Sequence, residues 1–220
     1  MCLHSIVPDP SNANRIWVGI SAVGVFGSSD SGKSWDTMNR GVRANFMPDP
    51  FPEFGQCPHK VLAHPGRPGL PYQQNHCGVF KSETAGDYWQ DITEGLPSWF
   101  VFVLDLHSQD PVTLFVLPED QVLGQDVGGG QRYVTEAKFR VYRSRNGGRD
   151  WEPMTRGLPQ ENAYLHVLRE GMATDGLDDC GIYVGTTTGQ LFYGRDNGDN
   201  WELLMEHIPP ILSVECGIAV

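Results

Sequence analysis

The sequence predicts an all-β fold built from repeated groups of short antiparallel strands, and three observations indicate it. Glycine and proline are abundant, with 26 Gly and 16 Pro in 220 residues, and both residue types end strands at turns. No apolar pattern with the 3.6-residue period of an α-helix extends along the chain. One eight-residue pattern occurs four times, each time after a short apolar segment that is typical of a strand.

The repeated pattern is Ser/Gly-x-Asp/Asn-x-Gly-x-x-Trp, and its second copy carries Thr at the acidic position. The four copies comprise Ser28, Asp30, Gly32 and Trp35; Ser82, Thr84, Gly86 and Trp89; Ser144, Asn146, Gly148 and Trp151; and Gly194, Asp196, Gly198 and Trp201. Successive tryptophans are 54, 62 and 50 residues apart, close to the roughly 40 to 50 residues of one propeller blade. We therefore expect one blade for each copy.

The residue types of the pattern explain its shape. The Asp or Asn side chain accepts backbone N–H bonds and fixes a tight turn, while the glycine adopts a positive φ without steric cost. The tryptophan then enters the next strand, where we expect it to pack between neighbouring sheets. These residues are therefore expected to be structural.

Each copy is preceded by further strand candidates, so that a repeat supplies about four short antiparallel strands, as in a propeller blade. The first strand of each repeat is expected at 3–7, 59–63, 100–106 and 164–169. We expect one propeller over residues 1–220, with blades at about 3–38, 59–92, 100–154 and 164–204 and a spare strand candidate at 211–216. This spare strand favours an open arc of four blades or part of a six- to eight-bladed ring. Alternatively, residues 211–216 replace residues 3–7 in a closed four-bladed ring.

The four copies resemble the Asp-box, or BNR, repeat of sialidases, sortilin-type receptors, xyloglucanases and photosystem II assembly factors. The segment from Tyr72 to Phe80 also resembles segments expected in bacterial BNR propellers, which are often labelled glycosyl hydrolase or exo-sialidase. The resemblance implies a β-propeller fold, but it is only weakly specific for any activity. Sialidase chemistry would need an arginine triad and an F/Y-R-I-P segment, which is absent. The arginines at 15, 43, 132, 140 and 169 have no context that singles them out, and thus structural or solvated roles are expected.

Charge and cysteine content restrict the partners and the compartment. With 16 Lys+Arg and 27 Asp+Glu the net charge is −11, which argues against a nucleic acid or an anionic membrane as partner. The apolar run from Trp99 to Leu104 is too short for a membrane helix, and no leader pattern follows Met1. The five cysteines, at 2, 57, 77, 180 and 216, lack C-x-x-C spacing and predict free thiols in a cytoplasmic protein.

Binding residues are expected on loops of the face opposite the repeated turns. Gln73, Gln74, Asn75 and His76 form an amide-rich cluster suited to a hydroxylated ligand, or to a polar network between blades. The insertion 118–138 carries the polar residues Glu119, Asp120, Asp126 and Tyr133 and a Gly-Gly-Gly run at 128–130. A loop this long predicts a lid over a groove or a disordered segment.

A metal site is not predicted, although five possible ligands crowd together. Cys57, His59, His64, His76 and Cys77 lie within 21 residues, but their spacing matches no standard zinc pattern, and tetrahedral sites need three or four convergent ligands. We expect no metal and no cofactor.

The predicted function is a non-catalytic platform that binds a protein or glycan through its loop face. The alternative is a glycoside hydrolase of the BNR type, which needs two carboxylates facing each other across a cleft. Candidates are the acidic residues Asp49, Glu53, Glu119, Asp120 and Asp126, and nothing in the sequence pairs them. No Ser-His-Asp context, phosphate loop or dinucleotide fingerprint is present.

Overall fold

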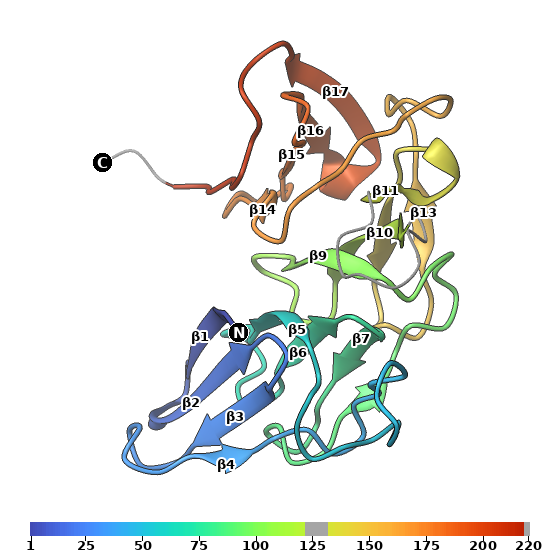
Figure 1. Cartoon of the computed structure of the whole chain (residues 1–220). Helices are drawn as coiled ribbons and strands as arrows, with labels where there is room; N and C mark the ends of the chain where they lie inside the picture. The colour runs from blue at the N-terminus through green and yellow to red at the C-terminus, as the bar shows by residue number, and fades with distance from the viewer. Residues whose placement is uncertain (122–131, 218–220) are drawn as a thin grey trace.

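The computed structural model describes residues 1–121 and 132–217 and confirms the all-β prediction. Within these residues the strands form four antiparallel sheets, which follow one another along the chain as an arc (Figure 1). The arc is open, so a closed four-bladed ring is wrong for this chain. No helix of the described part is long and apolar enough to cross a membrane.

The first two blades repeat the same order of four strands. Blade 1 consists of β1 (Leu3–Asp9), β2 (Asn12–Ile20), β3 (Gly24–Ser28) and β4 (Asp36–Thr37). Blade 2 consists of β5 (Pro58–Leu62), β6 (Tyr72–Asn75), β7 (Gly78–Lys81) and β8 (Gln90–Asp91). In both sheets the order in space equals the order in sequence, because each connection is a hairpin or a short loop.

The third and fourth blades repeat this order. Blade 3 contains β9 (Val101–Leu106), β10 (Leu114–Gln121), β12 (Val141–Ser144) and β13 (Glu152–Met154), and β11 (Arg132–Val134) pairs with the far end of β10. Blade 4 contains β14 (Met172–Thr174), β15 (Ile182–Gly185), β16 (Leu191–Arg195) and β17 (Asn200–Met205). Short 3-10 turns lie at Thr135–Ala137 and Asp196–Gly198.

Two predicted strands are absent from the described chain. Residues 164–169 form no strand, because the carbonyls of Leu165 and His166 accept hydrogen bonds from Val134 and Thr187 instead of joining a ladder. The inner strand of blade 4 is β14, a few residues later. Residues 211–216 form no strand either. Glu170 and Ser213 form an isolated bridge, and the amides of Ile211 and Val214 donate to the carbonyls of Thr186 and Glu170.

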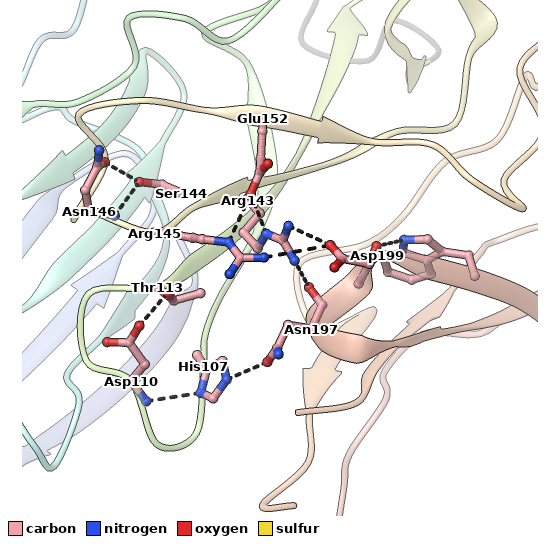
Figure 2. Close-up of polar contacts among 12 residues, drawn as sticks. His107, Asp110, Thr113, Arg143, Ser144, Arg145, Asn146, Glu152, Asn197 and Asp199 are labelled. Atoms are coloured by element: carbon pink, nitrogen blue, oxygen red, sulfur yellow. Dashed lines mark hydrogen bonds and ion pairs between the residues drawn. The ribbon is translucent and has the colours of Figure 1, made fainter. Parts of the chain in front are cut away.

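Side chains close the first three repeated turns, whereas the fourth is closed by a backbone bond from the Asp199 amide to the Asp196 carbonyl. In the first copy the Ser28 hydroxyl accepts a bond from the Gly32 amide at 2.8 Å, and the Asp30 carboxylate accepts bonds from the amides of Lys33 and Ser34, each at 2.9 Å. In the third copy Ser144 and Asn146 accept the corresponding bonds, and Figure 2 shows these two side chains bonded to each other. The second copy uses the hydroxyl of Thr84 in place of a carboxylate.

The four tryptophans of the repeats do not share one environment. Trp89 donates its indole N–H group to the carbonyl of Met38, and Trp151 donates to that of Ile92. Each acceptor directly follows the last strand of the preceding blade. Trp35 has no preceding blade in this chain, donates to Gly32 of its own turn, and is 42% exposed. Trp201 is buried but also donates within its own turn, to Gly198.

Apolar side chains fill the spaces between neighbouring blades. The interface of blades 1 and 2 includes Trp17, Val61 and Phe80, and the other two interfaces contain comparable clusters. Each such buried side chain contributes roughly 1.5 to 3 kcal/mol of transfer free energy. Packing between blades therefore stabilises the arc, since each small sheet alone has two faces to cover.

A buried arginine joins blades 3 and 4. The Arg143 guanidinium donates to Glu152 of its own blade and to Asp199 of the fourth repeat, both at 2.7 Å, and to the Asn197 carbonyl (Figure 2). Its side chain is 4% exposed while both carboxylates are half exposed. Because an unpaired buried charge is costly, this contact fixes the fourth turn against the third sheet.

Candidate ligand-binding site

Residues of blade 3 and of the segment before blade 4 bring an aromatic and cationic cluster together. Phe100 and Phe102, at the start of β9, are almost fully buried, with ring centroids 4.9 Å apart. The Arg132 guanidinium lies 4.4 Å from the Phe102 centroid and 4.9 Å from that of Phe100, and the Arg169 guanidinium lies 4.7 Å from that of Phe102. Guanidinium groups at these distances are attracted by aromatic rings.

Arg132 and Arg169 come from different blades. Arg132 begins β11 of blade 3, whereas Arg169 lies in the segment before β14 of blade 4. Neither has a carboxylate within 4.0 Å among the described residues, and the Nε atom of each is buried without a hydrogen-bond partner there. Neither side chain therefore forms a direct ion pair within the described chain, although the charges of Glu119 and Glu170 act on Arg132 and Arg169 respectively and favour their protonated forms.

Burial opposes the charge of both guanidinium groups. Desolvation lowers the pKa of Arg132, and the neighbouring charge of Arg169 lowers it further. Desolvation also lowers the pKa of Arg169. Arginine stays protonated at neutral pH. The Arg132 and Arg169 guanidinium groups therefore repel each other in a partly buried environment. An anionic group bound between them would relieve this repulsion and supply the missing acceptors.

Two histidines extend this cluster into blade 2. His59 of β5 is 1% exposed and stacks on Phe102 with centroids 4.5 Å apart. His76, in the turn between β6 and β7, is half-buried and packs edge-on against Phe100. Desolvation lowers the pKa of His76 to about 4 and, with the charges of Arg132 and Arg169, holds the pKa of His59 well below its usual value. Both imidazoles are therefore neutral at pH 7.

Glu119, a predicted site residue, is fully buried beside this cluster. Its carboxylate accepts hydrogen bonds from the Val167 amide and from the Nδ1 atom of His166, both at 2.8 Å. These bonds join β10 to the segment that carries Arg169. Glu119 therefore has internal partners that fix the position of this segment.

The other predicted residues of the insertion are placed nearby. Asp120 accepts a bond from the Glu136 amide at 3.0 Å, and Tyr133 packs edge-on against Tyr164. Both are half-buried. The predicted Asp126 and the glycine run at 128–130 lie outside the described residues.

The predicted amide cluster is buried rather than presented to solvent. Gln73, Gln74 and Asn75 are each 0% exposed. Gln74 donates to the carbonyl of Asn75, whose side chain accepts a bond from the Cys77 amide at 2.7 Å. Among the four predicted residues, only His76 reaches the surface, so a direct ligand contact by the other three stays a prediction without support here. Both polar atoms of the Gln73 side chain, Oε1 of Gln74 and Nδ2 of Asn75 are buried without a hydrogen-bond partner among the described residues, so the alternative, a polar network between blades, also stays a prediction.

The described carboxylates that were candidates for hydrolysis hold loops and turns. Asp49 accepts a bond from the Phe51 amide, and Glu53 accepts one from the Thr37 hydroxyl at 3.4 Å. Glu119 and Asp120 are occupied as described above. The described part of the chain thus gives each of these four carboxylates a local partner, and no group of two facing carboxylates is evident from these contacts.

The arginine pair was missed by the sequence analysis, because its two members are 37 residues apart and belong to different blades. Only the fold brings both of them to Phe102. The apolar run from Trp99 to Leu104 could have indicated the site, because it contains Phe100 and Phe102, the two rings against which the guanidinium groups lie.

Comparison with solved structures defines the class of the fold. The chain is similar to an ancestral GH74 enzyme (TM-score 0.64, 16% identity, 94% of this chain and 24% of that chain), to the GH74 enzyme of Niastella koreensis (0.58, 14%, 91% and 30%) and to YCF48 of Cyanidioschyzon merolae (0.52, 15%, 91% and 55%). It is also similar to YCF48 bound to D1 peptide (0.50, 16%, 92% and 53%). The fold is therefore a β-propeller with four blades in this chain.

These likenesses concern the fold alone. The chain spans about a quarter to a third of the GH74 chains and about half of the YCF48 chains. No family model and no curated protein matches the sequence.

Proposed function

We propose that this chain is a non-catalytic propeller platform of the Asp-box type, which binds a carboxylate-bearing protein segment or acidic glycan at Arg132 and Arg169. The observation that carries the proposal is the pair of guanidinium groups on Phe102 without a carboxylate partner among the described residues. Two arginines offer forked donors that match a carboxylate. The Phe100 and Phe102 rings hold the donors in place before a ligand arrives.

Several observations support the platform over the alternative, a glycoside hydrolase. The described carboxylates that were candidates for catalysis are engaged in local contacts. GH74 enzymes share the fold at low identity, and a shared fold does not define an activity. YCF48, a propeller of similar fold, has been solved with a bound peptide. The side-chain bonds of the repeated turns support assignment to the Asp-box type.

The compartment is also a proposal. All five cysteines are free, although their thiols range from exposed to buried. Free thiols persist in reducing surroundings, so we propose that the chain works in the cytoplasm. Mass spectrometry of alkylated protein from intact cells tests this, and finding disulfides there would contradict it.

The binding proposal is tested with ligands that differ only in charge. We would screen peptides with a free C-terminal carboxylate against the same peptides as amides, and uronate-containing oligosaccharides against their neutral counterparts. The proposal predicts that the charged member binds at least tenfold more tightly, because charged hydrogen bonds contribute roughly 1.5 to 3 kcal/mol. Arg132→Gln and Arg169→Gln should each remove most of this preference.

A matched control uses an arginine of the outer part of blade 4. Arg195 is 56% exposed in its side chain, so Arg195→Gln should leave the preference unchanged. Product analysis accompanies the oligosaccharide arm. Equal binding of charged and neutral members, or release of shortened sugars by the wild type, would contradict the non-catalytic platform.

A further inference from the structure

Three side chains of types that bind metals converge at one end of blade 2. Cys57 immediately precedes β5, His59 lies within β5, and His76 lies between β6 and β7. One potential ligand atom from each lies within 4.8 Å of the other two. The amide of His76 donates to the Cys57 carbonyl at 3.2 Å, so the backbone holds the two segments together. These three side chains are not the ones proposed to bind the carboxylate, although His59 and His76 pack against the same phenylalanine rings.

A β-bulge directs His59 into the cluster. The pairing of β5 with β6 is regular from Lys60 onward but shifts between Pro58 and Lys60, which leaves His59 as the extra residue. Bulges of this kind re-aim a side chain and occur next to functional sites. The shift turns the imidazole toward His76 and Phe102, where its ring centroid lies 5.3 Å from that of His76.

The tautomer of His59 decides which ring nitrogen is available to a metal. Its Nδ1 atom lies 3.0 Å from the Val101 carbonyl oxygen, a contact that needs a proton on Nδ1, and 3.1 Å from Nε2 of Gln74, a contact that needs a lone pair there. In the tautomer that donates to Val101, the lone pair is on Nε2, which faces His76. A backbone carbonyl that holds the second ring nitrogen is the arrangement that orients histidine ligands in metalloproteins.

The distance between the two imidazoles fits a shared ion. His59 Nε2 and His76 Nδ1 are 3.3 Å apart, and two nitrogens bound to one tetrahedral zinc ion are roughly 3.3 Å apart when each bond is about 2.0 to 2.1 Å. A zinc-bound sulfur would lie about 3.6 Å from each nitrogen, given a Zn–S bond of about 2.3 Å. Cys57 is half-buried and precedes the strand, so a small side-chain adjustment brings its sulfur into range.

Positive charge lies close to this metal-ligand cluster. The Arg132 and Arg169 guanidinium groups lie 4.4 and 4.7 Å from the centroid of Phe102, on which His59 stacks, and their charge opposes a bound cation. A deprotonated Cys57 offsets part of that repulsion, since metal binding releases the thiol proton.

We propose that Cys57, His59 and His76 bind one Zn²⁺ ion, with the fourth coordination position open to water or an anionic group. One thiolate and two imidazoles form a donor set that zinc accepts, and three protein ligands with an open position are known for zinc. Bound zinc would tie the start of β5 to the β6–β7 turn.

Cobalt(II) provides a direct test because it occupies zinc sites and reports its ligands by absorption. Protein freed of metal with a chelator is titrated with Co²⁺ under reducing conditions, and zinc is then added to displace it. The proposal predicts one equivalent of tetrahedral cobalt with a thiolate-to-cobalt charge-transfer band. Cys57→Ser should abolish that band, and His76→Gln should weaken binding at least tenfold.

Matched controls separate this site from other thiols and imidazoles. Cys216 and His207 are exposed, so Cys216→Ser and His207→Gln should leave the band and the affinity unchanged. Zinc should also raise the Tm of the wild type but not that of Cys57→Ser, which reports binding to the folded state. Absence of stoichiometric cobalt binding, or a band that survives Cys57→Ser, would overturn the proposal.

The arginine variants distinguish this site from the carboxylate site. Arg169→Gln should abolish the carboxylate preference yet tighten Zn²⁺ binding severalfold, because it removes a nearby positive charge. If Arg169→Gln kept its fold but lost zinc binding, the claim that the zinc site and the carboxylate site are separate would be contradicted.

Discussion

At the scale of single residues, the repeated turns show how one side chain closes a loop. Asp30 accepts hydrogen bonds from the hydroxyl groups of Ser28 and Ser34 and from two backbone amides. All of these donors favour the ionised carboxylate. They lower the pKa of Asp30 to about 2, with the Ser34 hydroxyl as the largest cause.

This pKa predicts how the first turn responds to acid. A folded-state pKa below the unfolded value stabilises the fold at pH values above the unfolded pKa, and the contribution is lost as the pH falls through the folded value. The turn contribution should therefore be complete above about pH 4, the unperturbed value, and disappear toward pH 2. Carboxyl-carbon NMR titration should give a pKa of about 2 for Asp30.

The same titration on two serine variants identifies the cause. Ser34→Ala should move the pKa of Asp30 back toward 3.8. Ser31→Ala is the control, because the Ser31 hydroxyl donates to Asn14 and not to Asp30. An Asp30 pKa that ignores Ser34→Ala would contradict the assignment.

Glycine within the repeat is required by both backbone and packing. Gly148 has φ of +84°, and a Cβ atom there would lie 2.4 Å from the Cδ1 atom of Ile92 in the preceding blade. Gly148→Ala should therefore destabilise the protein by more than about 1 kcal/mol, since strain and overpacking act together. Gly176→Ala is the control because nothing lies within 4 Å of its added Cβ. Chemical denaturation measures both, and equal midpoints would refute the explanation.

At the scale of elements, the blades depend on tryptophans that cross between sheets. Trp89 is 0% exposed and donates to the Met38 carbonyl at 2.8 Å, whereas Trp35 is 42% exposed. Trp89→Phe should cost roughly 1 to 3 kcal/mol, through a lost buried hydrogen bond and a partial cavity. Trp35→Phe should change the free energy of unfolding by less than about 0.5 kcal/mol. Similar losses for both variants would contradict a blade-crossing role for Trp89.

Much of the element pattern was predictable, for physical reasons. The turns are local, so the spacing of Asp30, Gly32 and their counterparts identified one blade per copy. The strand at 164–169 was predicted wrongly because the carbonyls of Leu165 and His166 accept bonds from Val134, at the end of β11, and from Thr187 instead of pairing with a neighbouring strand of blade 4. An apolar pattern shows that a segment is buried, but it does not show which backbone will accept its hydrogen bonds.

Functional residues were harder to predict than the fold. The amide cluster at 73–75 consists of polar residue types typical of binding sites, yet these residues face the interior. Conversely, Arg132 and Arg169 had no distinctive sequence context. Their significance comes from Phe102, which is far from both in sequence although both guanidinium groups lie within 5 Å of its ring centroid, at 4.4 and 4.7 Å.

At the scale of the whole molecule, the arc combines rigid blades with a small number of charges gathered near its inner ends. The net charge of the chain is −11, yet Arg132 and Arg169 form a local positively charged site beside buried aromatic rings. The negative charge of the whole chain repels a ligand that is negative along its length, whereas Arg132 and Arg169 attract a single carboxylate. We therefore expect a ligand with one carboxylate to bind better than a highly anionic one. The central claim is that both arginines act on the same carboxylate.

A double-mutant cycle of binding measures that claim most directly. Calorimetry would give the affinity of a carboxylate ligand selected by the paired screen for the wild type, Arg132→Gln, Arg169→Gln and the double variant. If both guanidinium groups bind one carboxylate, the two losses should not add, and the coupling should be about 1 kcal/mol or more. Additive losses, or no loss in either single variant, would contradict the claim.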